Sequence, residues 1–202
     1  SIGDVECRVN RISFSGELAY EVNVPANYGR FMWEKLMQAG KVFNITPYGT
    51  ETMHVLRAEK GYVIVGQDTD GSVTVDDLGL GWAISKTKVD FIGKRSFTRP
   101  DTARRGRKQL VGLLTEDPQT VIPEGAQLVD DPQAPLPVPM VGHVSSSYYS
   151  ACCGHSIALA LVKGGRERMG ETVYAPLASG RVIEATICEP LFYDKEGSKA
   201  NV

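Results

Sequence analysis

Alternating apolar and polar positions near the start of the chain predict a β-hairpin over residues 5–24. Ser15-Gly16 supplies the turn, and Ala19 to Val24 forms the return strand. Strand side chains alternate between two faces, so Tyr20, Val22 and Val24 share one face of the return strand. Glu21 and Asn23 then lie on the opposite face. The pattern therefore presents Glu21 away from the apolar side of the hairpin.

Two helices are predicted to follow the hairpin. The first begins with Asn27 as its N-cap and ends before Gly40, which suits the position just past a helix end. The second begins near Thr46-Pro47, a cap followed by a first-turn proline, and ends near Lys60. A Gly- and Asp-rich stretch, residues 67–82, is typical of a structured loop.

Beyond about residue 100, short β-rich segments alternate with Gly and Pro, a texture typical of a small β-barrel or sandwich. Turn chemistry surrounds Pro123-Glu124-Gly125, and the four prolines of residues 130–139 predict an irregular loop. The predicted strands are Gln109–Leu114, Met140–Ser146, Ile157–Val162 and Val182–Glu189. The predicted fold class is α+β, with an α+β domain over residues 1–98 and an all-β barrel domain over residues 99–202.

Composition adds few constraints. Apolar residues make up 42% of the chain, charged residues 23%, and the net charge is −2, so neither a nucleic-acid nor a membrane partner is expected. No apolar run reaches the roughly 20 residues of a spanning helix. The chain lacks a signal sequence and an initiator Met, which indicates a fragment of something longer. Four cysteines, too few for a disulfide scaffold, favour a cytoplasmic location.

Several motifs that carry chemistry are missing. The chain has no phosphate-binding Gly-rich loop, and Gly79-x-Gly81 lacks the third glycine and the helix of a dinucleotide site. Adjacent Cys152 and Cys153 cannot easily point at one metal ion, and no second ligand pair lies nearby. We therefore expect no metal, and we interpret this pair as small buried residues in a loop between strands.

Glu21 is the candidate binding residue. A carboxylate held by a strand offers two acceptor oxygens in a fixed fork, which suits a ligand edge with two adjacent N–H donors. A solvent-facing glutamate on a one-sided sheet gives the same pattern, and exposed glutamates are the commoner case. The pattern alone leaves both interpretations open.

Ordered motifs resemble the aminomethyltransferase family, which includes the T-protein of the glycine cleavage system, dimethylglycine oxidase and the sarcosine oxidase alpha subunit. Arg11 to Glu21 resembles the family's R-x-S/G-Y-T-G-E-x-G-Y/F-E signature. The other matching blocks, in order, are Leu56–Tyr62 with Gly66–Asp68, Asp77–Trp82, Phe91–Lys94, Gly142–Ser147, Ile157–Leu161 and Pro190–Asp194. The resemblance covers nearly the whole chain. It is closest to the C-terminal part of sarcosine oxidase alpha subunits.

The resemblance implies site residues. The glutamate that closes the first motif pairs with the pterin of tetrahydrofolate in the family, and it corresponds to Glu21. The family's usual tyrosine is Phe14 here, which can pack on a ring but cannot donate a hydrogen bond. Trp82 is implied as a wall of the folate cavity, and Tyr20 and Arg57 complete the implied set. Arg57 matches its own motif position, and its alternative is a structural role, paired with Glu59 or a loop carboxylate. Met53 replaces a family arginine, so that contact is not carried over.

The resemblance also implies a mechanism. Flavin elsewhere in the complex oxidises sarcosine to an imine, and tetrahydrofolate held by this module takes up the one-carbon unit, leaving glycine. FAD, FMN and NAD are expected only in other parts of the complex, with the other oxidase subunits as partners. The family's catalytic Asp lies in a preceding segment that this chain lacks, so the catalytic residue is unknown and the stretch alone is expected to be inactive. The alternatives are a true aminomethyltransferase and a non-catalytic folate-binding module.

Overall fold

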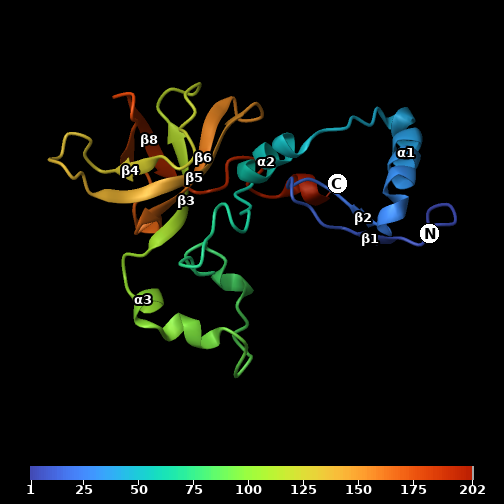
Figure 1. The fold of residues 1–202 in the computed structure, drawn as a ribbon, viewed down its shortest axis with the longest axis horizontal. Helices are drawn as coiled ribbons and strands as arrows, with labels where there is room; N and C mark the ends of the chain where they lie inside the picture. The colour runs from blue at the N-terminus through green and yellow to red at the C-terminus, as the bar shows by residue number, and fades with distance from the viewer. Residues whose placement is uncertain (202) are drawn as a thin grey trace. The chain divides into compact units, whose positions relative to one another are not determined.

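The computed structural model describes residues 1–201, and the chain divides into two compact units. The first unit comprises Ser1–Arg57 with Asp194–Val202, and the second comprises Ala58–Tyr193. Figure 1 labels the elements of both units. The predicted domain boundary near residue 98 remains a prediction.

The predicted hairpin is confirmed, with shorter strands than expected. β1 (Arg8–Asn10) pairs with β2 (Glu21–Asn23) in antiparallel register, and residues 11–20 connect them (Figure 1). The turn within this connection is held by Gly16, whose N–H donates to the Ser13 hydroxyl at 2.9 Å. Gly16 has φ 84°, a conformation that glycine adopts without the steric penalty of a side chain.

The first predicted helix is confirmed as α1 (Gly29–Gly40), but both predicted ends are wrong. A 3₁₀ turn (Ala26–Tyr28) precedes the helix and contains Asn27, so the N-cap is Tyr28, without a side-chain hydrogen bond. Gly40 is the last helical residue. A Cβ at Gly40 would lie 2.6 Å from the Ile45 Cβ, so close packing explains this glycine. The left-handed position belongs to Asn44, with φ 57°, after a second 3₁₀ turn (Lys41–Phe43).

The second helix, α2 (Thr50–Glu59), starts later than predicted. The Thr46 hydroxyl donates to the Asn44 carbonyl at 3.2 Å, so Thr46 belongs to the preceding turn. After α2, Val65 and Thr69 form only an isolated bridge, and residues 67–82 form turns. A short α3 (Pro100–Ala103) follows further along the chain.

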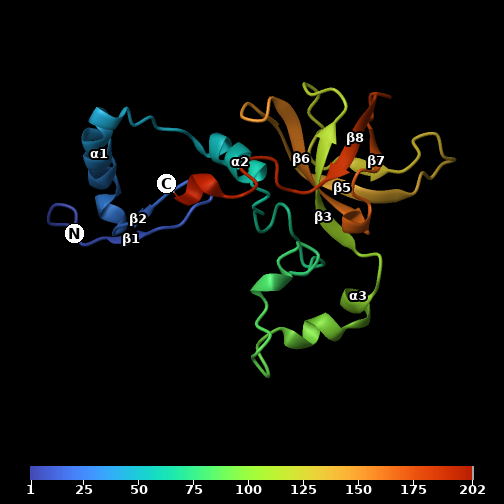
Figure 2. The same cartoon turned by 180° about the vertical axis from the view of Figure 1, so that it is seen from behind.

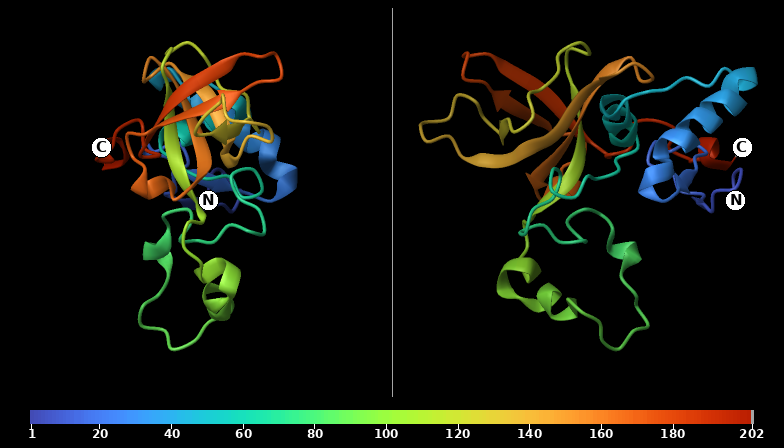
Figure 3. Two further views of the ribbon diagram at one scale, coloured as in Figure 1. Left: turned by 90° about the vertical axis from the view of Figure 1, so that its left-hand side faces the viewer. Right: turned by 45° about the vertical axis from the view of Figure 1, so that its right-hand side comes forward.

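The second unit contains a closed six-stranded barrel, which confirms the predicted fold class (Figures 1 and 2). The strands follow the order β3-β6-β5-β4-β7-β8 around the barrel. Four predicted strands are present, and β4 and β7 were not predicted. The bounds are β3 (Lys108–Thr115), β4 (Gln127–Val129), β5 (Met140–Ser150), β6 (His155–Lys163), β7 (Thr172–Pro176) and β8 (Val182–Cys188). Within this unit, residues 81–106 project from the barrel as an arm (Figure 3).

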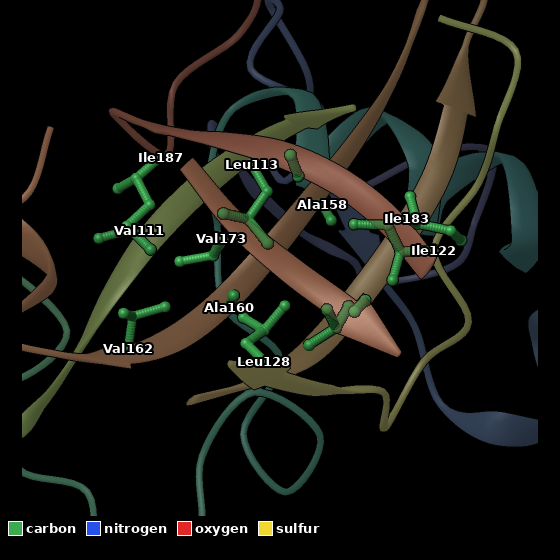
Figure 4. Close-up of a cluster of buried hydrophobic side chains, with 13 residues drawn as sticks. Val111, Leu113, Ile122, Leu128, Ala158, Ala160, Val162, Val173, Ile183 and Ile187 are labelled. Atoms are coloured by element: carbon green, nitrogen blue, oxygen red, sulfur yellow. The ribbon is translucent and has the colours of Figure 1, made fainter. Parts of the chain in front are cut away.

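Apolar side chains fill the barrel interior, and a second apolar cluster covers part of its outside. Figure 4 shows the interior side chains converging from the surrounding strands. On the outer face, Leu110, Leu159 and Leu161 pack with Ala58 and with partly buried residues of the following loop. Because both faces of β6 are covered, its sequence is a continuous apolar run instead of an alternating one.

Buried polar contacts fix the loop after α2 to the barrel. The Asp68 carboxylate is 1% exposed and accepts hydrogen bonds from Ile64 N at 2.8 Å, Ser145 Oγ at 2.5 Å and Ser146 Oγ at 2.7 Å. Glu59 is also buried and accepts from Ser150 Oγ at 2.6 Å. A buried carboxylate is tolerated only with such donors, so the serines of β5 set the position of this loop.

Arg107 links the arm, through Asp101, to the loop that contains Asp77. Its guanidinium binds the Asp77 carboxylate at 2.7 Å and the Asp101 carboxylate at 3.0 Å. Burial opposes ionisation of Asp77, but hydrogen bonds from Arg107 and Thr74 outweigh it and hold the pKa of Asp77 below its usual range. The same pairing raises the pKa of Arg107.

No helix within residues 1–201 combines the length and the apolarity needed to cross a lipid bilayer.

The Gly61→Ala substitution tests the tight turn after α2. Gly61 has φ 68°, and a Cβ there would lie 1.7 Å from the Pro190 carbonyl oxygen. Left-handed strain and overpacking together should lower the free energy of unfolding by more than about 2 kcal/mol. Gly66→Ala is the matched control, because Gly66 has φ 97° but open space around it. Equal losses for both variants in urea denaturation would contradict the close approach.

The Asp77→Asn substitution tests the ion pair with Arg107. A depressed native pKa stabilises the fold above the unfolded pKa of about 3.9 and loses that contribution as pH falls through the native pKa. We expect Asp77→Asn to cost about 3 kcal/mol at neutral pH and to flatten the acid limb of stability. The control is Asp76→Asn, whose partner Arg166 lies 3.5 Å away in an exposed pair. Matching pH profiles of the two variants would refute the role of Asp77.

Candidate functional site

The register of the hairpin gives it one polar face. Asn10 pairs with Glu21 and Arg8 pairs with Asn23, and directly opposed residues of an antiparallel pair project to the same side. Glu21 is exposed, and its carboxylate has no hydrogen-bond or ion-pair partner within residues 1–201. Both oxygens of this carboxylate are therefore available to a ligand with paired donors.

The opposite face carries Val9 and Val22, which are opposed in the same register. It is incompletely covered: Val9 is 53% exposed and Tyr20, just before β2, is 59% exposed. Phe14, in the connection between the strands, is 36% exposed. The first unit thus brings Glu21, Tyr20 and Phe14 together on one short hairpin, with aromatic surface on the same element as the carboxylate.

A shallow hollow adjoins the open end of the hairpin. It has a volume of about 470 Å³ and is lined by Glu6, Cys7, Arg8, Asn23, Val24 and Pro25. Arg8 and Asn23 therefore connect the polar face to this hollow. The lining mixes one acidic, one basic and one amide side chain, so charge alone favours no ligand class.

Arg57 and Trp82 have contrasting surroundings. Arg57 is fully buried in α2, which indicates a structural contribution, and its predicted ligand contact remains a prediction. Trp82 is 79% exposed on a 3₁₀ turn (Gly81–Ala83) of the second unit. It belongs to a different unit from the hairpin, so its role as a cavity wall also remains a prediction.

His143 lies on the outside of the barrel next to a lysine. The Lys108 ammonium is 3.2 Å from His143 Nδ1, a distance that lets it donate to the neutral ring. Burial, and next the charge of Lys108, lower the pKa of His143, while Asp70 opposes them. The ring is therefore neutral near pH 7, and its contribution to stability is lost as pH falls below the unfolded pKa of about 6.5.

The cysteine pair differs from its sequence interpretation. Cys152 is exposed and Cys153 is half-buried in the turn between β5 and β6, so the prediction that both are buried was wrong. A tight turn leaves one of two successive side chains at the surface. The part of the chain that the structure describes holds no cluster of three or more His, Cys, Asp or Glu residues suited to a metal ion.

Sequence reasoning missed the buried acceptors Asp68 and Glu59. Their signal was present, because Glu59 lies in the Leu56–Tyr62 block and Asp68 follows it in Gly66–Asp68. Their serine partners lie on β5, 77 to 91 positions further along the chain. The motif marked these residues, and the fold shows that Asp68 anchors the loop, and Glu59 the end of α2, to the serines of β5.

Two family models match consecutive parts of the chain. The GCVT N-terminal domain matches residues 1–88, and the glycine cleavage T-protein C-terminal barrel domain matches residues 108–194. A solved structure agrees with them: aminomethyltransferase T of the glycine cleavage system from Bartonella henselae superposes with a TM-score of 0.79 at 25% identity. That superposition covers 93% of this chain and 50% of the other.

Curated relatives fall into two groups by similarity. The alpha subunits of sarcosine oxidase from Corynebacterium sp. (strain P-1) and Rhizobium meliloti are 51% and 42% identical over 96% and 95% of this chain. An aminomethyltransferase from Caldanaerobacter subterraneus is 29% identical over 98%. The chain spans 20% of the length of the alpha subunits and 50% of that aminomethyltransferase. With both domain models matched in order, the chain belongs to the aminomethyltransferase (glycine cleavage T-protein) family.

Proposed function

We propose that this chain is the folate-binding C-terminal part of a sarcosine oxidase alpha subunit. In this role it supports the oxidative demethylation of sarcosine to glycine and the transfer of the one-carbon unit to tetrahydrofolate. Identities of 51%, 50% and 42% to sarcosine oxidase alpha subunits, against 26–30% to aminomethyltransferases, support this branch of the family. The other subunits of such an oxidase are the proposed partners.

One observation carries the folate proposal: Glu21 is exposed on the polar face of the hairpin and lacks a side-chain partner within residues 1–201. The aminopyrimidine edge of a pterin presents a ring N–H beside an exocyclic amine. A carboxylate accepts both donors at once, and such charge-assisted pairs are about twice as strong as neutral ones. The residues present therefore fit the pterin end of folate.

Tetrahydrofolate, when bound, supplies the nitrogens that take up the one-carbon unit. The hairpin's task is to hold it in one orientation, because fixed geometry replaces the entropy that an encounter in solution would lose. Glu21 fixes the pterin edge, while the exposed ring of Phe14 offers surface that excludes water. Tyr20 lies on the opposite face of the strand, so its ligand contact remains a prediction. The flavins and nicotinamide of the oxidation are proposed to bind elsewhere in the complex.

A second candidate is the aminomethyltransferase of the glycine cleavage system, which would take its methylene group from a lipoyl-bound aminomethyl carrier. The superposition on the Bartonella henselae aminomethyltransferase favours it. The two differ in partners: the oxidase needs a flavin-containing complex, whereas the aminomethyltransferase needs a lipoyl protein. Flavin absorbance that co-purifies with the full-length protein would favour the oxidase.

The Glu21→Gln substitution in the full-length oxidase complex tests this proposal. Loss of a charged acceptor should weaken tetrahydrofolate binding by about 10- to 100-fold. Sarcosine oxidation should continue, and the one-carbon product should change from 5,10-methylenetetrahydrofolate to formaldehyde. Calorimetry measures the first effect, and product analysis under oxygen consumption measures the second.

Glu34→Gln is the matched control. Glu34 is an exposed glutamate on α1, where it pairs with Arg30 at 2.8 Å. This variant should bind tetrahydrofolate as the unaltered protein does. If Glu21→Gln binds with the same affinity as Glu34→Gln, the proposed role of Glu21 fails.

A further inference from the structure

The polar face of the hairpin holds a second polar side chain beside Glu21. Asn10 is the direct cross-strand partner of Glu21. It is half-buried, and its side-chain amide has no hydrogen-bond partner within residues 1–201. No motif of the family resemblance includes Asn10, and the proposed function assigns it no role. A strand amide without a partner beside the binding carboxylate requires an explanation.

Two asparagines, Asn10 and Asn23, lie on this face, and Asn10 is the nearer of the two to Glu21. Directly opposed residues have Cβ atoms about 4.5–5.5 Å apart. Successive same-face residues of one strand are separated by about 6.6 Å, twice the rise per residue. Asn10 is therefore closer to Glu21 than Asn23 is, and two β strands hold it in fixed register.

The chemistry of the pterin edge supplies the reason for an amide at this position. Beside the amine and the ring N–H stands the 4-oxo group, which is an acceptor. A carboxylate accepts hydrogen bonds and repels such an oxygen, so a donor must lie next to Glu21. The asparagine amide provides two N–H donors on a short side chain.

We propose that Asn10 is a positioning and specificity-determining residue that donates a hydrogen bond to the 4-oxo group of the pterin held by Glu21. The proposal rests on the proposed function. Glu21 and Asn10 together then read three adjacent groups of the ring edge: the amine, the N–H and the carbonyl. This donor–donor–acceptor pattern distinguishes 4-oxo pterins from rings that lack the carbonyl.

The experiment uses the full-length oxidase complex with tetrahydrofolate labelled with ¹³C at C4. Asn10→Leu should weaken binding about fivefold, as expected for one neutral hydrogen bond. It should also move the C4 resonance of the bound ligand, because the carbonyl loses its donor. Asn10→Gln, which keeps the amide, should restore part of both effects.

Asn23→Leu is the matched control on the same face, and it should leave the affinity within about twofold and the C4 resonance unchanged. Asn10→Asp keeps the size and polarity of the side chain if Asn10→Leu fails to fold. It should bind more weakly than Asn23→Asp, which adds the same charge at the more distant position.

Two outcomes separate this inference from the function on which it rests. If Glu21→Gln weakens binding while Asn10→Leu and Asn23→Leu have equal affinities and an unchanged C4 resonance, Asn10 is not a pterin contact. If neither Glu21→Gln nor Asn10→Leu alters tetrahydrofolate binding, both the folate assignment of the hairpin and the role of Asn10 fail.

Discussion

Three backbone pairings between β1 and β2 set which side chains of the hairpin share a face. A shift of one residue would turn one strand over relative to the other, setting Val9 opposite Glu21 or Val22 opposite Asn10, so that the face would no longer be polar. Every binding role argued for this chain depends on that register, because a fixed carboxylate beside a fixed amide can read a planar ring edge. The connection held by Gly16 and Ser13 adds an aromatic ring to the same element.

Periodicity predicted the hairpin, both long helices and four barrel strands, because each of these has a sustained apolar pattern. It missed β4, which has only three residues, and β7, which ends at Pro176. β4 is too short to display a period, and β7 alternates in burial but ends at a proline, a residue that interrupts a strand pattern. The predicted end of the first helix was wrong because Gly40 is required by its close packing against Ile45, not by a left-handed conformation past the helix end. The apolar pattern does not reveal such a contact.

Local patterns predicted only part of the candidate site. Alternation alone placed Glu21 opposite Tyr20, and the family resemblance supplied the ligand that we propose for it. Contacts across long stretches of sequence were beyond any local pattern, as for Asp68 with the serines of β5 or His143 with Lys108. Asn10 has no motif to mark it, and its proposed role follows only from its register opposite Glu21.

A crystal structure of the full-length complex with tetrahydrofolate bound would test the central claim most directly. We expect both Glu21 carboxylate oxygens to lie about 2.7–3.2 Å from the pterin ring nitrogen and its exocyclic amine. A pterin bound away from the hairpin, or a Glu21 carboxylate engaged by a basic side chain instead of the ligand, would contradict the proposed role of Glu21.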